Sequence, residues 1–464
     1  MSGNWTAAMP DNNLGKQVYI NARLLDPASG LDVKGSLITD GETISDFGEN
    51  IFPDGLPSDA EIIDCGGKCL SPGFVDFRVQ IREPGEEHKE TIETAGRSAT
   101  AGGITTMVCL PNTIPIIEDM SVVGFVARRA RLIGLSKIYP YAALTKKLEG
   151  MELTEMGVLA QAGAVAFTDG EKVIADPQVL RRALTYALTF DLLIIQHPEE
   201  PSLASGVMNS GEMSTRLGLP GIPTVAETII VERDIRLVEL TGGKIHFANV
   251  STKDAIEAIR KAKSKGLKIT CDTAPPYFSL NENSVGEYRT FAKLSPPLRN
   301  EQDRLSVVEA LQDGTIDLIA SSHAPQDEDS KRLPFAQAAY GGVGLETLLP
   351  VCLELYHNGH MSLLECLSKI TSGPAHLLGL PAGQLIKGQR ADLTLFDPDE
   401  GWLVQADNLA SKAKNTPFDG RPVQGTVLRT VIDGRAVYQS SNCLLYTSDA
   451  ADEGLGVDLG GRRI

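Results

Sequence analysis

Short apolar runs alternate with amphipathic stretches through most of this chain. Runs of this kind are typical of buried parallel strands, and the stretches between them have the spacing of helices that cover a sheet. The alternation extends from about residue 73 to residue 380, which predicts a parallel sheet, and a closed (β/α)8 barrel of the TIM type fits that length. The expected strands include residues 105–110, 164–167, 192–195, 244–247, 267–271 and 317–320.

The two ends of the chain have a different pattern. Short β segments separated by Gly, Pro and Asp turns occur before the barrel, and β character returns after it. We therefore expect a barrel flanked by the two halves of a small β-sandwich domain, which pack together beside it. The segments are residues 17–70 for the first half, 71–380 for the barrel and 381–440 for the second half.

Composition narrows the functional classes. A net charge of −17 argues against a nucleic-acid partner, because phosphate binding needs a basic surface. No apolar stretch is long enough to cross a bilayer, and no secretory signal pattern is visible. Seven cysteines, an odd number, are typical of buried or free thiols in a reducing compartment. We expect a cytoplasmic protein that binds neither nucleic acid nor membranes.

Residues 443–464 need separate treatment. The segment from Cys443 to Glu453 is what one reading frame of a common transposase-type sequencing adapter encodes, and Val457 to Ile464 matches the continuation of that adapter. We interpret residues 443–464 as a sequencing-adapter artefact and exclude them from the fold, as a tag would be excluded. The alternative is a natural acidic tail, and resequencing the end of the gene distinguishes the two.

In such a barrel the chemistry lies at the carboxyl ends of the strands, so the residues that follow each apolar run matter most. The first expected strand follows the apolar entry at residues 71–75 and carries a cation and an amide, Arg78 and Gln80, at alternate positions. The polar residues after later runs are Asn112, Asp169, His197, Asn249 and Ser322.

These strand ends and several longer strings resemble the dihydroorotases of the amidohydrolase superfamily, the type that associates with aspartate carbamoyltransferase. The resemblance extends from about Val18 to Tyr438, and the string at residues 411–420 separates dihydroorotases from hydantoinases and allantoinases. The most specific strings are residues 82–85 with Glu90 and Thr91, and residues 111–113, 295–299, 313–317, 344–347 and 411–420.

The resemblance implies a zinc centre with six ligand positions, of which four are substituted in this chain. Asp169 and His197 match the acidic ligand after the fourth strand and the histidine after the fifth. The substituted positions are Arg78 and Gln80 for the two histidines of the first strand, Asn249 for a later histidine, and Ser322 for the aspartate that is also the general base.

These substitutions remove the donors that zinc needs. Zinc takes three or four nitrogen, sulfur or carboxylate donors, and Arg78 is permanently protonated. At ~4 Å and an effective dielectric of ~20, each unit charge on a metal is disfavoured by about 4 kcal/mol beside that guanidinium. Ser322 cannot replace a carboxylate as a proton acceptor. We therefore expect no metal cofactor and no catalytic residue.

The resemblance also implies a binding site for the substrate carboxylate, and part of it is kept. Arg82 and Asn112 match two of its residues, whereas Gln326 stands in place of a late histidine. Arg82 can hold a carboxylate bidentately; alternatively, it pairs with a neighbouring acid such as Glu83 and supports the barrel mouth. We treat the three residues as a vestigial substrate site.

Three further expectations concern the remaining polar groups of the barrel mouth. His197 is expected to hydrogen-bond to Asp169 or Asn249, and His323 to be a packed loop residue. The glycine-rich segment at residues 341–344 is expected to form a flexible loop over the pocket.

Two functions of different class follow. The first, which we favour, is a non-catalytic dihydroorotase homologue of pyrimidine biosynthesis, retained as a partner of aspartate carbamoyltransferase and possible as a homo-oligomer. The second is an active dihydroorotase with an altered zinc centre, for which Asp169 and His197 are the only evident ligands. A cytoskeletal or signalling scaffold is a third alternative, which the string at residues 411–420 disfavours.

Overall fold

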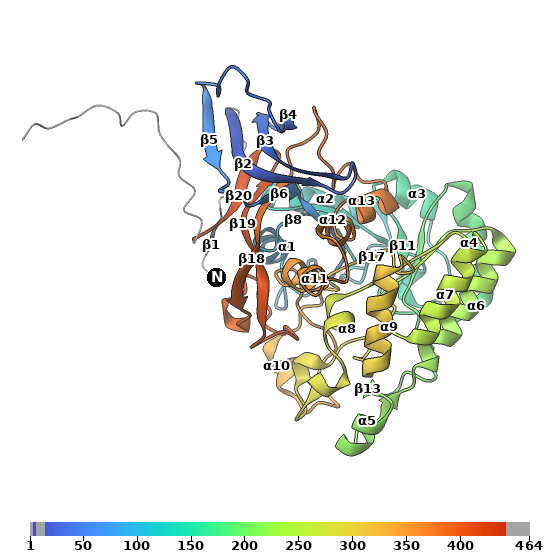
Figure 1. The fold of residues 1–464 in the computed structure, drawn as a ribbon. Helices are drawn as coiled ribbons and strands as arrows, with labels where there is room; N and C mark the ends of the chain where they lie inside the picture. The colour runs from blue at the N-terminus through green and yellow to red at the C-terminus, as the bar shows by residue number, and fades with distance from the viewer. Residues whose placement is uncertain (1–2, 6–13, 442–464) are drawn as a thin grey trace, which may run out of the picture.

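The computed structural model describes residues 3–5 and 14–441 of the chain. A barrel of alternating strands and helices lies beside a layer of β-structure that both ends of the chain build (Figure 1). This arrangement confirms the predicted fold class. The segment interpreted as an adapter artefact lies outside the described residues.

Parallel strands follow one another around the barrel in chain order, as the apolar runs predict. The last of them meets the first through a parallel bridge between Val79 and His323, where the Gln80 amide donates to the His323 carbonyl at 2.9 Å. The barrel strands in the described residues are β7 (Phe74–Val79), β8 (Ile104–Cys109), β9 (Lys137–Pro140) continued by β10 (Ala142–Ala143), β11 (Phe167–Thr168), β12 (Ile194–Gln196), β15 (Ile245–Phe247), β16 (Ile269–Thr273) and β17 (Leu318–Ile319).

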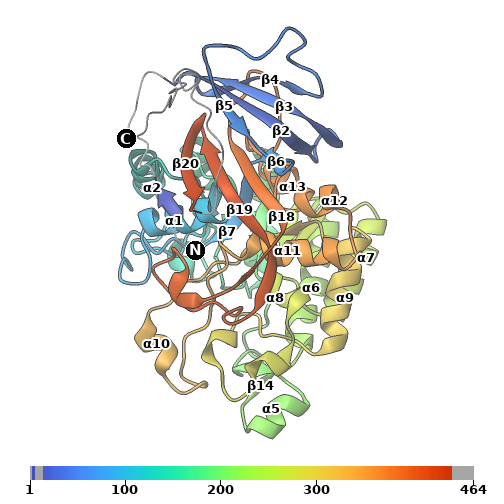
Figure 2. The same cartoon turned by 60° about the vertical axis from the view of Figure 1, so that its left-hand side comes forward.

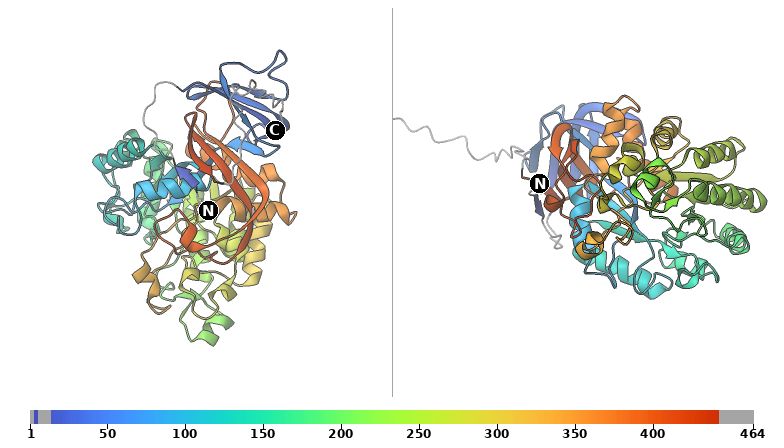
Figure 3. Two further views of the ribbon diagram at one scale, coloured as in Figure 1. Left: turned by 90° about the vertical axis from the view of Figure 1, so that its left-hand side faces the viewer. Right: turned by 90° about the horizontal axis from the view of Figure 1, so that it is seen from below.

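Helices form an outer ring around these strands (Figure 3). In α7, one buried stripe of Ala255, Ile256, Ile259 and Ala262 packs inward, and the other faces are polar. The helices are α1 (Ile92–Ala101), α2 (Met120–Ile133), α3 (Met156–Gln161), α4 (Pro177–Thr189), α5 (Glu212–Leu217), α6 (Val225–Thr241), α7 (Lys253–Ser264), α8 (Pro275–Ser279), α9 (Glu301–Gln312), α10 (Glu328–Arg332), α11 (Leu348–His357), α12 (Leu363–Ser368) and α13 (Ser372–Leu378).

The β layer joins the two ends of the chain in one sheet. Its strand order is β1-β20-β19-β18-β6-β2-β3-β4, with β5 paired to β2, so β6 joins β2 to the carboxyl-terminal strand β18, while β1 lies at the far edge beside β20 (Figure 2). These strands are β1 (Gly3–Trp5), β2 (Lys16–Asp26), β3 (Leu31–Asp40), β4 (Thr43–Gly48), β5 (Ala60–Asp64), β6 (Cys69–Pro72), β18 (Leu393–Leu403), β19 (Pro422–Ile432) and β20 (Arg435–Ser440). A short parallel pair, β13 (Met208–Asn209) and β14 (Gly221–Ile222), lies outside both sheets.

The β layer and the barrel share one hydrophobic core. Phe396 of β18 meets Phe74 of β7 edge to face, with ring centroids 6.0 Å apart. Val427 and Tyr438 belong to the same buried cluster as Phe167 and Ile245 of the barrel. The carboxyl-terminal strands are therefore part of the packing of the barrel.

Two sequence expectations bear on the described residues as a whole. The six cysteines among residues 14–441 are all buried. No helix in that range combines the length and the apolar content that a bilayer crossing requires.

Candidate functional site

The end of the first barrel strand places a guanidinium and an amide inside the barrel mouth. The exposed fraction is 3% for Arg78 and 4% for Gln80. The Arg78 Nη2 donates to the Gly170 carbonyl at a long 3.5 Å, and the Asn112 Nδ2 donates to the Gln80 Oε1 at 3.3 Å. The pair therefore faces the loops that follow β8 and β11.

Asp169 is buried and turned toward β10. Its Oδ1 accepts a hydrogen bond from the Thr145 backbone amide at 2.8 Å, and its Oδ2 accepts one from the Thr145 hydroxyl. Burial raises the pKa of the Asp169 carboxyl, and the two Thr145 hydrogen bonds oppose that rise. Both carboxylate oxygens thus already have a donor.

His197 is held by a serine of a distant loop. Its Nε2 lies 3.3 Å from the Ser295 Oγ, while its Nδ1 is buried and has no hydrogen-bond partner among the described residues. The prediction that His197 hydrogen-bonds to Asp169 or Asn249 is wrong, because its observed partner is Ser295. Burial, together with the positive charges of Arg78 and Arg299, lowers the pKa of His197 to about 3. The imidazole is therefore neutral at neutral pH.

The two remaining substituted positions contact each other. The Asn249 Nδ2 donates to the Ser322 Oγ at 2.9 Å, and the Asn249 Oδ1 is buried with no hydrogen-bond partner among the described residues. Both residues have left-handed backbone conformations, with φ of 54° for Asn249 and 53° for Ser322. Side chains other than Asn, Asp and Gly rarely adopt this region, so the turn at Ser322 is strained.

His246, which lies three residues before Asn249, is fully engaged elsewhere. Its Nδ1 lies 2.8 Å from the Thr270 Oγ1, and its Nε2 lies 2.8 Å from the Asp272 Oδ2. The ring also packs edge to face on Phe77, with centroids 5.8 Å apart. It does not take the place of the missing histidine.

These positions do not fit a zinc centre. Zinc needs three or four donors from His, Cys, Asp or Glu. Within residues 14–441, no group of three or more such side chains is arranged to hold a metal ion. Both carboxylate oxygens of Asp169 already accept hydrogen bonds from Thr145. The other potential ligand is His197, and the positive charge of Arg78 lowers the pKa of its imidazole.

The residues that the resemblance assigns to the substrate are bonded to their own surroundings. Arg82 donates from Nε to the Pro325 carbonyl at 3.1 Å and from Nη1 to the Glu86 Oε2 at 3.0 Å. The expectation that Arg82 pairs with a neighbouring acid is correct, but the acid is Glu86, since Glu83 receives the Arg129 Nε at 3.0 Å. The guanidinium of Arg82 is thus largely occupied.

The late loops of the barrel hold Gln326 and His323 in place. The Gln326 Nε2 donates to the Tyr340 carbonyl at 2.8 Å. His323 is completely buried, as a packed loop residue should be, and its Nδ1 accepts from the Gly344 amide at 3.2 Å. The Asn415 Nδ2 reaches the Ala324 and Gly341 carbonyls at 3.2 Å and 3.0 Å. The string at residues 411–420 therefore positions the loops of the mouth.

The structure contains a buried ion pair behind the mouth that the sequence did not predict. The Arg299 Nη2 lies 3.6 Å from the Glu227 Oε2, and its Nε donates to the Ser251 Oγ at 3.1 Å. Arg299 lies in the string at residues 295–299 without an assigned role. Glu227 lies on α6, where nothing in the local sequence distinguishes a buried acid from a solvated one.

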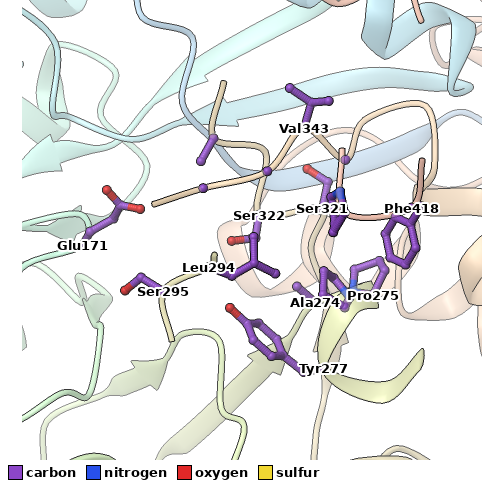
Figure 4. Close-up of a pocket in the computed structure, with 16 residues that line it drawn as sticks. Glu171, Ala274, Pro275, Tyr277, Leu294, Ser295, Ser321, Ser322, Val343 and Phe418 are labelled. Atoms are coloured by element: carbon purple, nitrogen blue, oxygen red, sulfur yellow. The ribbon is translucent and has the colours of Figure 1, made fainter. Parts of the chain in front are cut away.

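Two adjoining cavities open at Ser295. The inner one, of about 20 Å³, has room for roughly one water and is lined by Ser295, Ser322, Tyr277 and the segment 341–344. The hydroxyls of Ser322 and Tyr277 are directed toward the side where Glu171 stands (Figure 4). The outer cavity, of about 240 Å³, has Glu171, Glu199 and Tyr340 on its wall.

Comparison with known proteins agrees with this architecture. A sequence model described as "Dihydro-orotase-like" matches residues 67–255, and one described as "Amidohydrolase family" matches residues 353–438. The chain is 48% identical over 426 residues to a protein described as dihydroorotase from Anaplasma phagocytophilum, which covers 91% of this chain and 95% of that one. It is 45% identical over 445 residues to a protein with the same description from Wolbachia, covering 95% and 100% of the two chains. This chain belongs to the dihydroorotase family.

Solved structures place the family within a wider fold. The L-hydantoinase of Arthrobacter aurescens superposes with a TM-score of 0.81 at 24% identity, covering 90% of this chain and 95% of that one. The dihydropyrimidinase of Brevibacillus agri superposes with a TM-score of 0.79 at 22% identity, covering 91% and 95%. At this identity the likeness concerns the fold, a barrel with a β layer built from the chain ends.

Proposed function

We propose that this dihydroorotase-family chain serves pyrimidine biosynthesis as a non-catalytic partner of aspartate carbamoyltransferase. Its place in the pathway rests on the 48% identity to a protein described as dihydroorotase, over 95% of that protein's length. The loss of hydrolysis rests on one observation, the buried guanidinium of Arg78 at the end of the first barrel strand. We further propose a cytoplasmic location and the division into residues 17–70, 71–380 and 381–440.

The chemistry of cyclic amide hydrolysis explains why Arg78 carries the proposal. The reaction needs an activated water and a group that accepts its proton. Arg78 supplies neither, because it has no lone pair and no accessible neutral form. Ser322 stands at the position of the family base, and its hydroxyl donates and accepts hydrogen bonds without holding a proton from water.

A second candidate is an active dihydroorotase with an altered metal centre. The near full-length identity to proteins that are described by this activity favours it, and that similarity supports it more directly than it supports the first candidate. In this case Asp169 and His197 would be the ligands, and Asp169 would have to leave Thr145 to reach a metal. No residue is evident as the replacement base.

Metal content and turnover separate the two candidates. We expect the purified chain to hold well below one zinc and to leave dihydroorotate unchanged. A preparation with roughly one zinc per chain, and with turnover that His197→Ala abolishes, would contradict the non-catalytic proposal. His88→Ala is the matched control, because His88 is exposed and lines neither cavity.

Assembly tests the second half of the proposal. Co-expression with aspartate carbamoyltransferase should give a complex of fixed stoichiometry on size exclusion with light scattering, and the same run reports any homo-oligomer. Failure to form a complex at micromolar concentrations would remove the proposed partner role.

The combined Arg78→His, Gln80→His, Asn249→His and Ser322→Asp variant should gain zinc. The zinc affinity gained by the combined variant should differ from the sum of the gains of the four single changes.

A further inference from the structure

Three helices on the outside of the barrel contain no acidic residue. Helices α2, α3 and α4 follow one another around the barrel, and we call them the α2–α4 sector (Figure 1). Their sequences contain five arginines and no Asp, Glu or Lys, although the whole chain has 60 acidic and 43 basic residues. The arginines are Arg128, Arg129, Arg131, Arg181 and Arg182. The sector is therefore basic on a chain whose net charge is −17.

Four of the five arginines have no counter-ion. The Arg129 Nε lies 3.0 Å from the Glu83 Oε1. The other four are exposed, and no carboxylate oxygen of residues 3–5 or 14–441 lies within 4.0 Å of them. The helix dipole accounts for Arg131 alone, which lies in the last turn of α2. Arg181 and Arg182 lie near the amino end of α4, where the dipole gives a cation no advantage.

Exposed apolar side chains lie on the same helices. The exposed fraction is 79% for Leu132 of α2, 43% for Val158 of α3 and 44% for Leu188 of α4. Phe190, at the end of α4, is 46% exposed. Its ring lies against Gly157, where an added Cβ would be 2.8 Å from the Phe190 Cζ, so α3 and α4 form one continuous surface.

This composition is typical of an interface between proteins. Arginine and aromatic residues are enriched at the cores of such interfaces, whereas Lys, Glu and Asp are depleted. Single exposed apolar side chains are ordinary on a protein surface, but several of them among unpaired cations mark an interaction site. The α2–α4 sector has both features, because it combines five arginines with exposed apolar groups and contains no Lys, Asp or Glu.

Charge distinguishes between three occupants of this sector. A second copy that docks through the same sector would place arginines against arginines, which is repulsive. An anionic membrane is an extended plane, so it would also bring acidic groups of this −17 chain within the Debye length of about 8 Å. A protein face of limited area can place its own carboxylates opposite the arginines alone. The charge pattern therefore favours an acidic face of another protein.

We propose that the α2–α4 sector is the docking surface for an acidic, partly apolar face of a partner protein. Arg128, Arg131 and Arg182 pair with carboxylates of that face, and Leu132 and Phe190 pack against its apolar side chains. No residue of the three helices lines either cavity of the barrel mouth. The identity of the partner, aspartate carbamoyltransferase, rests on the proposed function.

Binding of the full chain to immobilised aspartate carbamoyltransferase tests the charges. Arg128→Glu combined with Arg131→Glu should weaken binding roughly 10- to 100-fold, mainly through a slower association rate. The association rate of the wild type should fall as salt rises from about 50 mM to about 300 mM, and that of the variant should depend less on salt. Lys261→Glu combined with Lys265→Glu at the end of α7 is the matched control, since both lysines are exposed. It should change the Kd by less than about threefold.

Two further variants test the sector without relying on the double charge reversal. Leu132→Ser should weaken binding about 10-fold, because an exposed side chain that becomes buried in the complex is lost. Leu305→Ser on α9, which is 52% exposed, is its control and should leave the Kd unchanged. Arg182→Glu should weaken binding roughly 3- to 10-fold and reports on α4 separately from α2. Each variant should keep the wild-type Tm, since the changed side chains are exposed.

The outcomes separate this proposal from the proposed function. A complex whose Kd is the same for the wild type and all sector variants overturns the docking surface and leaves the partner role standing. Absence of any complex with the wild type contradicts the partner role and this proposal together. Capture of the wild type by phosphatidylserine vesicles, but not of the double arginine variant, would assign the sector to a membrane and overturn the proposal. A homodimer that the double variant dissociates on size exclusion would overturn it in favour of a second copy.

Discussion

Glu227 provides a quantitative test of the structure around the barrel mouth. Its carboxylate accepts the Ser251 and Thr252 amides, both at 3.0 Å, and their hydroxyls at 2.5 Å and 2.9 Å. These donors precede the first turn of α7, so Glu227 satisfies amides at the start of that helix. Its only counter-charge within ion-pair distance among the described residues is Arg299 at 3.6 Å.

The magnitude follows from burial. Both side chains of the ion pair are 2% exposed, so removing one leaves the other as a buried charge without a counter-ion. Glu227→Ala should therefore lower the free energy of unfolding by about 3–5 kcal/mol. Glu227→Gln keeps the shape and one acceptor oxygen, and it should cost about 1.5–3 kcal/mol for the lost charged hydrogen bonds.

Urea unfolding followed by circular dichroism measures these changes. Glu232→Ala on the exposed face of the same helix is the control, with an expected change of about 0.5 kcal/mol or less. Adding Arg299→Met to Glu227→Ala should cost less than the sum of the two single changes, because the pair is then removed together. A Glu227→Ala variant within 1 kcal/mol of the wild type, or strict additivity, would refute the reasoning.

Three further predictions concern Asp234, Asn415 and Gly85. Burial raises the pKa of Asp234 from 3.8 to about 6, so the folded chain keeps a proton that the unfolded chain has lost in this window. The free energy of unfolding of the wild type relative to Asp234→Asn should thus fall by roughly 2 kcal/mol from pH 4 to pH 7 in urea titrations, and a flat difference would contradict the assigned burial. Asn415→Ala should lose about 2–4 kcal/mol in the same assay, since three hydrogen bonds to the mouth loops disappear, whereas exposed Asn408→Ala should lose little. Gly85→Ala places a Cβ 2.3 Å from the Ile114 carbonyl at φ +107°, so its Tm should fall well below that of Gly55→Ala, which has φ +104° and open space; equal Tm values would refute the close approach.

The fold could be predicted because its signal is local and repeated. Each expected barrel strand, such as residues 105–110 or 267–271, overlaps an observed strand, because burial on both faces demands an apolar run. The predicted strand 317–320 extends one residue beyond the observed β17 at each end.

The partners of the site residues could not be predicted in the same way. His197 meets Ser295, which is 98 positions away in the sequence, and no local pattern reports such a contact. Arg82 pairs with Glu86 instead of the adjacent Glu83, because a turn in which the Glu86 amide bonds to the Arg82 carbonyl at 2.8 Å brings position 86 back beside the guanidinium. The identity of side chains at strand ends is readable from sequence, but their pairing depends on loop geometry.

The shared core of barrel and β layer has a consequence for how the chain is made. Phe396 and Val427 pack into the same cluster as Phe74, the start of the first barrel strand. During synthesis these residues emerge after the whole barrel, so the apolar surface around Phe74 stays uncovered until the barrel has left the ribosome. We expect the nascent protein to depend on chaperones until β18 and β19 arrive, and a fragment that ends before Leu393 to aggregate instead of folding.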